Sequence, residues 1–209
     1  MICWISTEET TNMKAITTLK KQLNELRAYD RSIKLFLSIP ILFGMYFAIK
    51  GLFFNFYILA LGADKAYLGL ANGMTPAATL ILAFPIGVLT DRIGRKRTVL
   101  YGLIILAASY LSFLLTTNQT LMLVLLFLSG IGETMFFIAE VPLLTRLTNP
   151  KNRITVFSLW SALFTFSGVV GSFIGGQMPL WFESLFGVIP ETYGSYRGIL
   201  LTCFFLLLT

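Results

Sequence analysis

Two charged side chains, Lys50 and Glu133, lie inside long apolar stretches of this 209-residue chain. An unpaired charge at the centre of a lipid bilayer costs about 2.5–3.5 kcal/mol, so such residues normally face a partner or a wet cavity. A carboxylate there can carry a proton, and an ammonium can pair with it or contact a solute. The two residues therefore indicate a substrate or proton pathway, with a structural ion pair between two helices as the alternative.

Aromatic residues accompany Lys50 at helical spacing. On a helical wheel its face carries Phe43, Tyr46, Phe54 and Tyr57, whereas Gly44, Ala48, Gly51 and Asn55 form a separate face of small residues suited to helix packing. Aromatic rings around a cation suit an organic substrate or cation–π contacts. The candidate residues of the pathway are Lys50, Glu133, Tyr46, Tyr57 and Asn55.

The composition places these residues in a membrane protein. Apolar residues make up 56% of the chain and charged residues only 12%, too few to cover a soluble domain of this length. Histidine is absent, and Cys3 and Cys203 lie too far apart in sequence for a metal or redox motif, so we expect no metal site and no cofactor. The net charge of +6 is spread between apolar segments, which favours membrane topology over nucleic-acid binding.

The apolar segments predict an all-α polytopic membrane protein. A hydrocarbon core of about 30 Å needs roughly 20 helical residues. Five segments supply that length, and a sixth starts near Arg197 but is too short, so we expect it to be truncated at Thr209. The expected spans are 36–60, 66–89, 97–115, 120–142, 153–175 and the incomplete 197–209, with an interfacial aromatic segment at 177–196.

The same spans bring the two buried charges within reach of each other. Counting 1.5 Å per residue from the expected inner ends places Lys50 about 21 Å deep and Glu133 about 14 Å deep. The difference of about 7 Å can be bridged by two long side chains.

The Lys and Arg residues predict the orientation. Six precede the first span, four lie in 92–97 and three in 146–153, against Lys65 and Arg197 on the other face. Cytoplasmic loops carry the excess of positive charge, so we expect a cytoplasmic amino terminus in the cell membrane. Residues 1–34 form a cytoplasmic leader, which is either an amphipathic surface helix or a solvated segment.

The turn between the second and third expected spans carries the most specific motif. Its sequence, GVLTDRIGRKRTVL over 87–100, resembles the loop signature of the major facilitator superfamily, G-x-L-a-D-r-x-G-r-k. The resemblance implies that residues 35–209 form an amino-terminal six-helix bundle, that a second bundle follows, and that the two rock to alternate access. The matching residues are Gly87, Leu89, Asp91, Arg92, Gly94, Arg95 and Lys96.

The motif residues have distinct expected tasks. Gly87 permits close helix approach, Gly94 permits a tight reversal, and Asp91 can meet the amino terminus of a helix. In the family, the matching acid is thought to contact the second bundle and help to close the cytoplasmic gate. Arg95 has either a gate or a topology role, and the neighbouring Arg97 favours topology.

Glu140 resembles the acid that closes the fourth helix in many facilitators. We expect its carboxylate to bridge Arg92, Arg95 or Arg153 in the closed gate, in preference to a substrate role. The candidate residues of the gate are thus Gly87, Asp91, Arg92, Gly94, Arg95, Lys96, Glu140 and Arg153.

Two elements of the drug/proton antiporters match poorly. Their fourth helix carries an arginine about four residues before a glycine, and Leu126 stands there, four residues before Gly130. Their fifth-helix signature, G-x-x-x-G-P-x-x-G-G, has serine at its first glycine and at its proline here. Gly171, Gly175 and Gly176 of that segment still suit helix packing.

These observations lead to a secondary active transporter of a small organic solute, coupled to protons through Glu133. Its expected partners are the solute, H⁺, the lipid bilayer and a carboxyl-terminal bundle. The alternatives are a transport-inactive half-bundle, degenerate or sensor-like, and an uncoupled facilitator. An enzyme is not expected, because the chain has no histidine, phosphate loop, nucleophile elbow or metal-spaced acids.

Overall fold

The computed structural model describes residues 31–150, 152–187 and 193–208, and in these ranges the chain forms helices without strands. This confirms the all-α class predicted from the apolar segments. Five helices are long and apolar enough to cross a membrane, and the last has 16 residues. The helices are α2 (Arg31–Ala60), α3 (Lys65–Ile93), α4 (Arg95–Leu115), α5 (Gln119–Leu147), α6 (Arg153–Phe186) and α7 (Tyr193–Leu208).

Short polar or glycine turns separate successive helices. Asp64 caps the start of α3 by accepting a hydrogen bond from the Tyr67 amide at 2.7 Å. Asn118 caps α5 in the same way. Gly94 is the only residue between α3 and α4, and its φ of +91° lies in a region that residues with a Cβ rarely adopt. The reversal predicted at Gly94 therefore depends on glycine.

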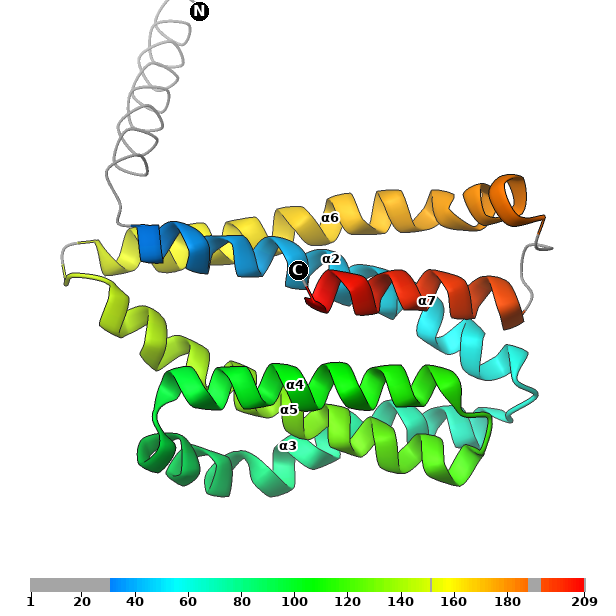
Figure 1. Cartoon of the computed structure of the whole chain (residues 1–209), viewed down its shortest axis with the longest axis horizontal. Coiled ribbons are helices and arrows are strands. Elements are labelled where there is room, and N and C mark those ends of the chain that lie inside the picture. The colour runs from blue at the N-terminus through cyan, green and yellow to red at the C-terminus, as the bar shows by residue number, and fades with distance from the viewer. Residues whose placement is uncertain (1–30, 151, 188–192, 209) are drawn as a thin grey trace, which may run out of the picture.

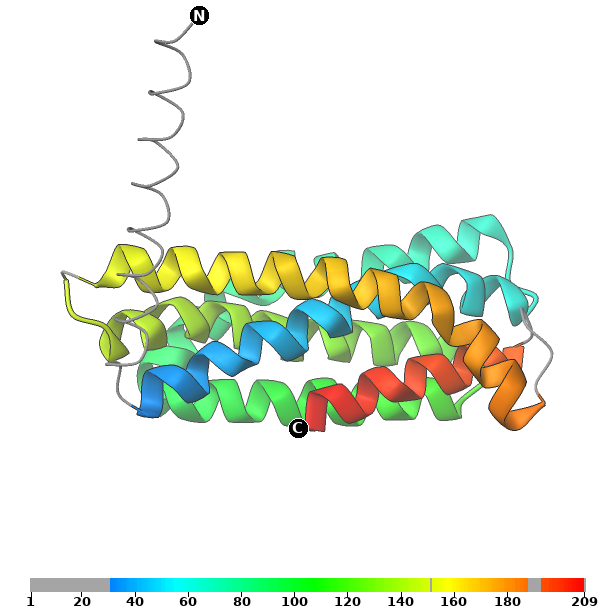
Figure 2. The ribbon, with the colours of Figure 1, turned by 90° about the horizontal axis from the view of Figure 1, so that it is seen from above.

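The helices form two groups of three, one of which, α2 with α6 and α7, combines helices that are far apart in sequence. Helix α5 packs along α3 and α4, whereas α2 packs along α6 and α7 (Figure 1). Contacts between α2 and the helices α3 and α5 are few by comparison. In both views the helices run roughly along one common direction (Figures 1 and 2). The space between the two groups is where the candidate pathway residues meet.

Glycines allow the backbones within each group to approach. A Cβ on Gly171 of α6 would lie 2.8 Å from the Cα of Met45 in α2, and one on Gly132 of α5 would lie 2.6 Å from the carbonyl oxygen of Gly102 in α4. Small residues at helix crossings are typical of membrane bundles, where van der Waals packing replaces the hydrophobic effect.

Only some of the glycines predicted to pack between helices do so. Gly175 faces Leu52 of α2, but a Cβ on Gly176 would meet no atom within 4 Å. Because successive residues lie about 100° apart around a helix, Gly176 points away from the contact that Gly175 makes. The small-residue face of α2 is likewise only partly used for packing. Gly44 packs against α6, whereas a Cβ on Gly51 would meet no atom within 4 Å.

Several expected boundaries differ in the structure. Helix α6 continues to Phe186, so residues 177–186 extend the fifth span where a separate interfacial segment was expected. Its carboxyl end turns toward α7 (Figure 2). Helix α6 also contains Pro179, which lacks an amide hydrogen for the helical ladder. Residues 31–34 begin α2, and the rest of the expected leader, 1–30, lies outside the described residues, as does Cys3.

Candidate functional site

An ion pair between α2 and α5 forms the centre of the site. The Nζ of Lys50 lies 2.6 Å from Oε1 of Glu133, and the two side chains are 14% and 9% exposed. The similar depths of Lys50 and Glu133 in their expected spans had predicted that the two side chains could meet. Because α2 and α5 belong to different groups of helices, the pair bridges the space between the groups. It is the only ion pair in which both partners are residues that the structure describes.

Aromatic rings surround the ammonium of Lys50. Its nitrogen lies 5.2 Å from the ring centre of Tyr46, 5.8 Å from that of Phe47 and 5.9 Å from that of Tyr110. These distances allow cation–π attraction, which is stronger where water is excluded. The rings and Glu133 together stabilise a positive charge within an apolar span.

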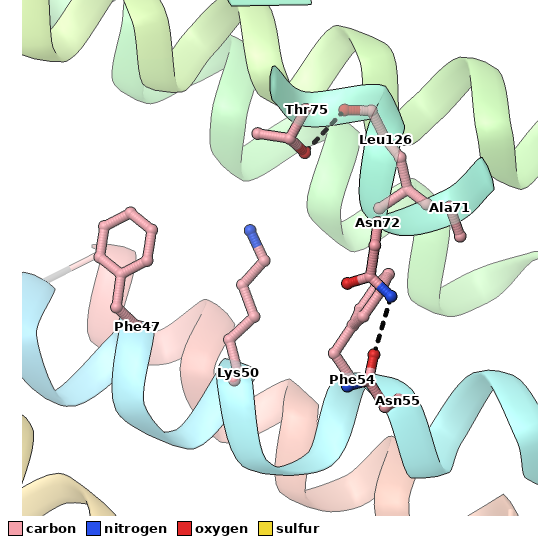
Figure 3. Close-up of a pocket in the computed structure, with 9 residues that line it drawn as sticks. Phe47, Lys50, Phe54, Asn55, Ala71, Asn72, Thr75 and Leu126 are labelled. Atoms are coloured by element: carbon pink, nitrogen blue, oxygen red, sulfur yellow. Dashed lines mark hydrogen bonds between the residues drawn. The ribbon is translucent and has the colours of Figure 1, made fainter. Parts of the chain in front are cut away.

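A pocket of about 200 Å³ opens beside Lys50 (Figure 3). The side chain of Lys50 extends from α2 toward α3 across this pocket (Figure 3). At one side, Asn72 of α3 donates a hydrogen bond from Nδ2 to Oδ1 of Asn55 at 3.0 Å. The pocket lining comprises Phe47, Lys50, Gly51, Phe54, Asn55, Ala71, Asn72, Thr75 and Leu126, from α2, α3 and α5.

The structure brings some predicted pathway residues together and separates one. Tyr46 contacts the Lys50 ammonium, and Asn55 lines the pocket rather than packing between helices. Tyr57 is fully buried, and its ring packs edge-on against Phe113 of α4 at 5.6 Å. Since two helical turns separate Tyr57 from Lys50, its ring is not among those around the ammonium.

Sequence reasoning missed the contribution of α3. Asn72 and Thr75 line the pocket, and Tyr110 of α4 faces the ammonium. Asn72 carried a usable signal, because an amide within an apolar span needs a polar partner. Tyr110 carried no such signal in the sequence, since aromatic residues are common on the buried faces of such helices.

The loop motif lies around the α3–α4 turn, and most of its charged side chains are exposed. Asp91, Arg92 and Lys96 are exposed, and none of them forms an ion pair with the described residues. A Cβ on Gly87 would meet no atom within 4 Å, so the close helix approach expected there is not made by this part of the chain. Ile86 lies on the buried face of α3 in place of Gly87.

The ion pair expected for Glu140 is not formed. Its side chain is buried in α5, and within the described ranges no ion pair joins it to Arg92, Arg95 or Arg153. Arg95 donates instead from Nη1 to the carbonyl oxygen of Pro142 at 3.0 Å. This hydrogen bond holds the start of α4 against the carboxyl-terminal part of α5 and directs the guanidinium to the backbone.

Comparisons with known proteins give a consistent result. Residues 35–209 match the sequence profile of the Major Facilitator Superfamily. The uncharacterized MFS-type transporter YqjV of Bacillus subtilis (strain 168) is 28% identical over 155 residues, which are 71% of this chain and 37% of that protein. Multidrug resistance protein MdtH of Yersinia pestis (strain Pestoides F) is 25% identical over 156 residues, 75% of this chain and 39% of that protein. The matched part of this chain thus spans less than two-fifths of these relatives.

Proposed function

The chain belongs to the major facilitator superfamily, and we propose that it forms the amino-terminal bundle of a secondary active transporter. Members of this family are transporters rather than enzymes, and the five apolar helices make this a multi-pass membrane protein. The proposed transporter moves a small organic solute across the cell membrane by alternating access.

The Lys50–Glu133 ion pair is the observation that carries this proposal. Both charges lie within apolar spans, where burying a charge is costly, and Lys50 also lines an open pocket. Glu133 is the proposed proton carrier, because a carboxylate can be neutral in one state of the cycle and ionised in another.

A second bundle is part of the proposal. The relatives are more than twice as long as the part of them that this chain matches, and a central pathway needs two walls. In the assembled transporter the exposed Asp91 would contact the second bundle at the cytoplasmic gate. Glu140 and Arg153, both near the inner end, belong to the same proposed gate together with Arg92, Arg95 and Lys96.

Two other functions remain distinct from coupled transport. A transport-inactive half-bundle would retain the fold without using the pocket, and an uncoupled facilitator would use the pocket without the proton. We favour coupled transport because Lys50 both lines the pocket and forms the ion pair with Glu133.

The test is a proton-flux assay with the intact gene product in liposomes that contain a pH-sensitive dye. A panel of small organic acids, amines and neutral solutes is added outside, and a coupled solute changes the internal pH. We expect at least one solute class to move protons in the wild type and none in Glu133→Gln, while Glu133→Gln still exchanges labelled solute. Equal proton flux in both proteins would remove Glu133 from coupling.

A further inference from the structure

The pocket exposes one partner of the ion pair and not the other. Lys50 lines the pocket, whereas Glu133 does not, although their charged atoms are 2.6 Å apart. Every other lining residue is uncharged. A solute that enters the pocket therefore meets a positive charge first.

The polar groups on the wall also favour an acceptor on the solute. An ammonium has three donor hydrogens, and within the described ranges Lys50 donates only to Glu133, so two remain. Asn55 accepts a hydrogen bond from Asn72 through its amide oxygen, and its amide nitrogen donates to no described residue. The nitrogen of Asn72 is already shared between Asn55 and the carbonyl oxygen of Leu68.

The rest of the wall suits a compact apolar body. Phe47 and Phe54 lie on either side of Lys50 along α2, and Leu126 and Ala71 complete the apolar part (Figure 3). The pocket volume is about 200 Å³. A cavity of about 150 Å³ is enough to hold benzene, so one aromatic ring with a carboxylate fits this space.

A carboxylate bound to Lys50 changes the charge balance at Glu133. The empty site contains one ammonium and one carboxylate and is neutral. A second carboxylate would leave a net negative charge within an apolar span, and like charges at this distance disfavour ionisation of both acids. Uptake of one proton by Glu133 makes the occupied site neutral. The conformational change that carries the solute and the proton across the membrane then moves no net charge through the membrane potential.

We propose that the solute is an organic acid with a compact apolar body, and that its carboxylate replaces Glu133 at the Lys50 ammonium while Glu133 takes up a proton. The step forms and breaks only ionic and hydrogen bonds. One proton from water binds to Glu133 for each solute anion bound. This inference rests on the proposed transport function and specifies its substrate class and its coupling.

The test compares the binding of four ring compounds of similar size to the intact gene product in detergent. Benzoate and phenylacetate carry the negative charge, benzylammonium carries the opposite charge, and benzyl alcohol carries none. Calorimetric titration at pH 6, 7 and 8, in two buffers of different ionisation enthalpy, gives both the affinity and the number of protons taken up. At these pH values the acids are ionised, since carboxyl groups ordinarily titrate near pH 4.

We expect the acids to bind more tightly than benzylammonium and benzyl alcohol. Their affinity should rise as the pH falls, approaching about tenfold per pH unit for one proton bound with the ligand. Glu133→Gln should bind the acids at least as tightly, with no proton uptake and no dependence on pH. Glu183→Gln, the same change at an exposed position in α6, is the matched control and should keep the wild-type dependence.

A double variant guards against misfolding from an unpaired charge. Lys50→Met with Glu133→Gln removes both charges and should lose at least about tenfold in affinity for the acids, a difference of about 1.4 kcal/mol. Tighter binding of benzylammonium, no binding of either acid, or acid binding that is independent of pH in the wild type would each overturn the proposal. Proton flux driven only by an amine or a neutral solute would contradict the organic acid while leaving coupled transport in place. Binding of the acids with proton uptake, but without any flux in liposomes, would contradict transport while leaving the binding site.

Discussion

At the scale of single residues, the contact between Lys50 and Glu133 combines stability with function. The two side chains are mostly buried, and the rings of Tyr46 and Tyr110 lie 5.2 and 5.9 Å from the ammonium. Removing one member leaves the other without its partner in an apolar span. Removing both members leaves no unpaired charge, so the two substitutions should not act independently.

A double-substitution cycle measures this dependence. Lys50→Met and Glu133→Gln should each lower the thermal unfolding temperature in detergent, because each leaves an unpaired polar group. The double variant should be milder than the sum of the two, with an interaction free energy of about 0.5–3 kcal/mol. Strictly additive losses would show that the pair contributes nothing beyond its two separate side chains.

Asp91 is an exposed residue whose expected role concerns motion more than stability. Asp91→Asn keeps the shape and removes the charge, which would delete an attraction to a helix terminus of about 0.3–1 kcal/mol. The variant of the intact protein should reach the membrane at normal abundance, transport slowly and expose its cytoplasmic gate to thiol reagents. Normal transport with normal accessibility would exclude Asp91 from the gate.

At the scale of helices, close backbone approach positions the site. Helix α2 is held against α6 through Gly44 and Gly171, and this contact sets the rotation of α2 that turns Lys50 toward α5. On the other side, Gly130 of α5 packs against Thr75 of α3, one of the residues that line the pocket. The glycines therefore determine which residues face the space between the two groups.

Two glycines of α6 provide a matched comparison. Gly171→Ala places a Cβ 2.8 Å from the backbone of Met45, so the helices must shift apart, at a cost of about 1–3 kcal/mol. Gly176→Ala meets no atom within 4 Å and should be neutral, or more stable by up to about 1 kcal/mol through helix propensity. Thermal unfolding of both variants tests this. Equal effects would mean that α2 and α6 do not need the close approach.

At the scale of the whole molecule, charge distribution predicts the orientation in the membrane. The helix ends on either side of the α3–α4 turn carry Arg92, Arg95, Lys96 and Arg97, whereas Lys65 is the first residue of α3 after the turn from α2. Positively charged loops stay on the cytoplasmic side. The two turns should therefore lie on opposite faces of the membrane.

Cysteine labelling in intact cells tests this orientation. In a background without Cys3 and Cys203, Lys65→Cys should react with a membrane-impermeant thiol reagent added outside. Lys96→Cys should react only after the membrane is opened. Both positions are exposed in the structure, so a lack of reaction at Lys96 would reflect its side of the membrane rather than burial. The reverse pattern would invert the topology.

The sequence alone was enough to determine the membrane class, the all-helical fold, the family motif at 87–100 and the depth match between Lys50 and Glu133. These features depend on hydropathy, on the rise per residue and on local motifs, all of which act along the chain. The Gly94 reversal is equally local, since it depends on the backbone of one residue.

Only the tertiary structure decided which side chains share the pocket. It placed Asn72 and Thr75 beside Lys50, packed Tyr57 against α4, and gave Arg95 a backbone carbonyl in place of the Glu140 carboxylate. It also separated Gly175, which packs, from Gly176, which does not. The reason is that a helical wheel gives the angles between residues but not the rotation of the helix about its axis. That rotation is set by the neighbouring helices, through contacts between segments that lie far apart in sequence.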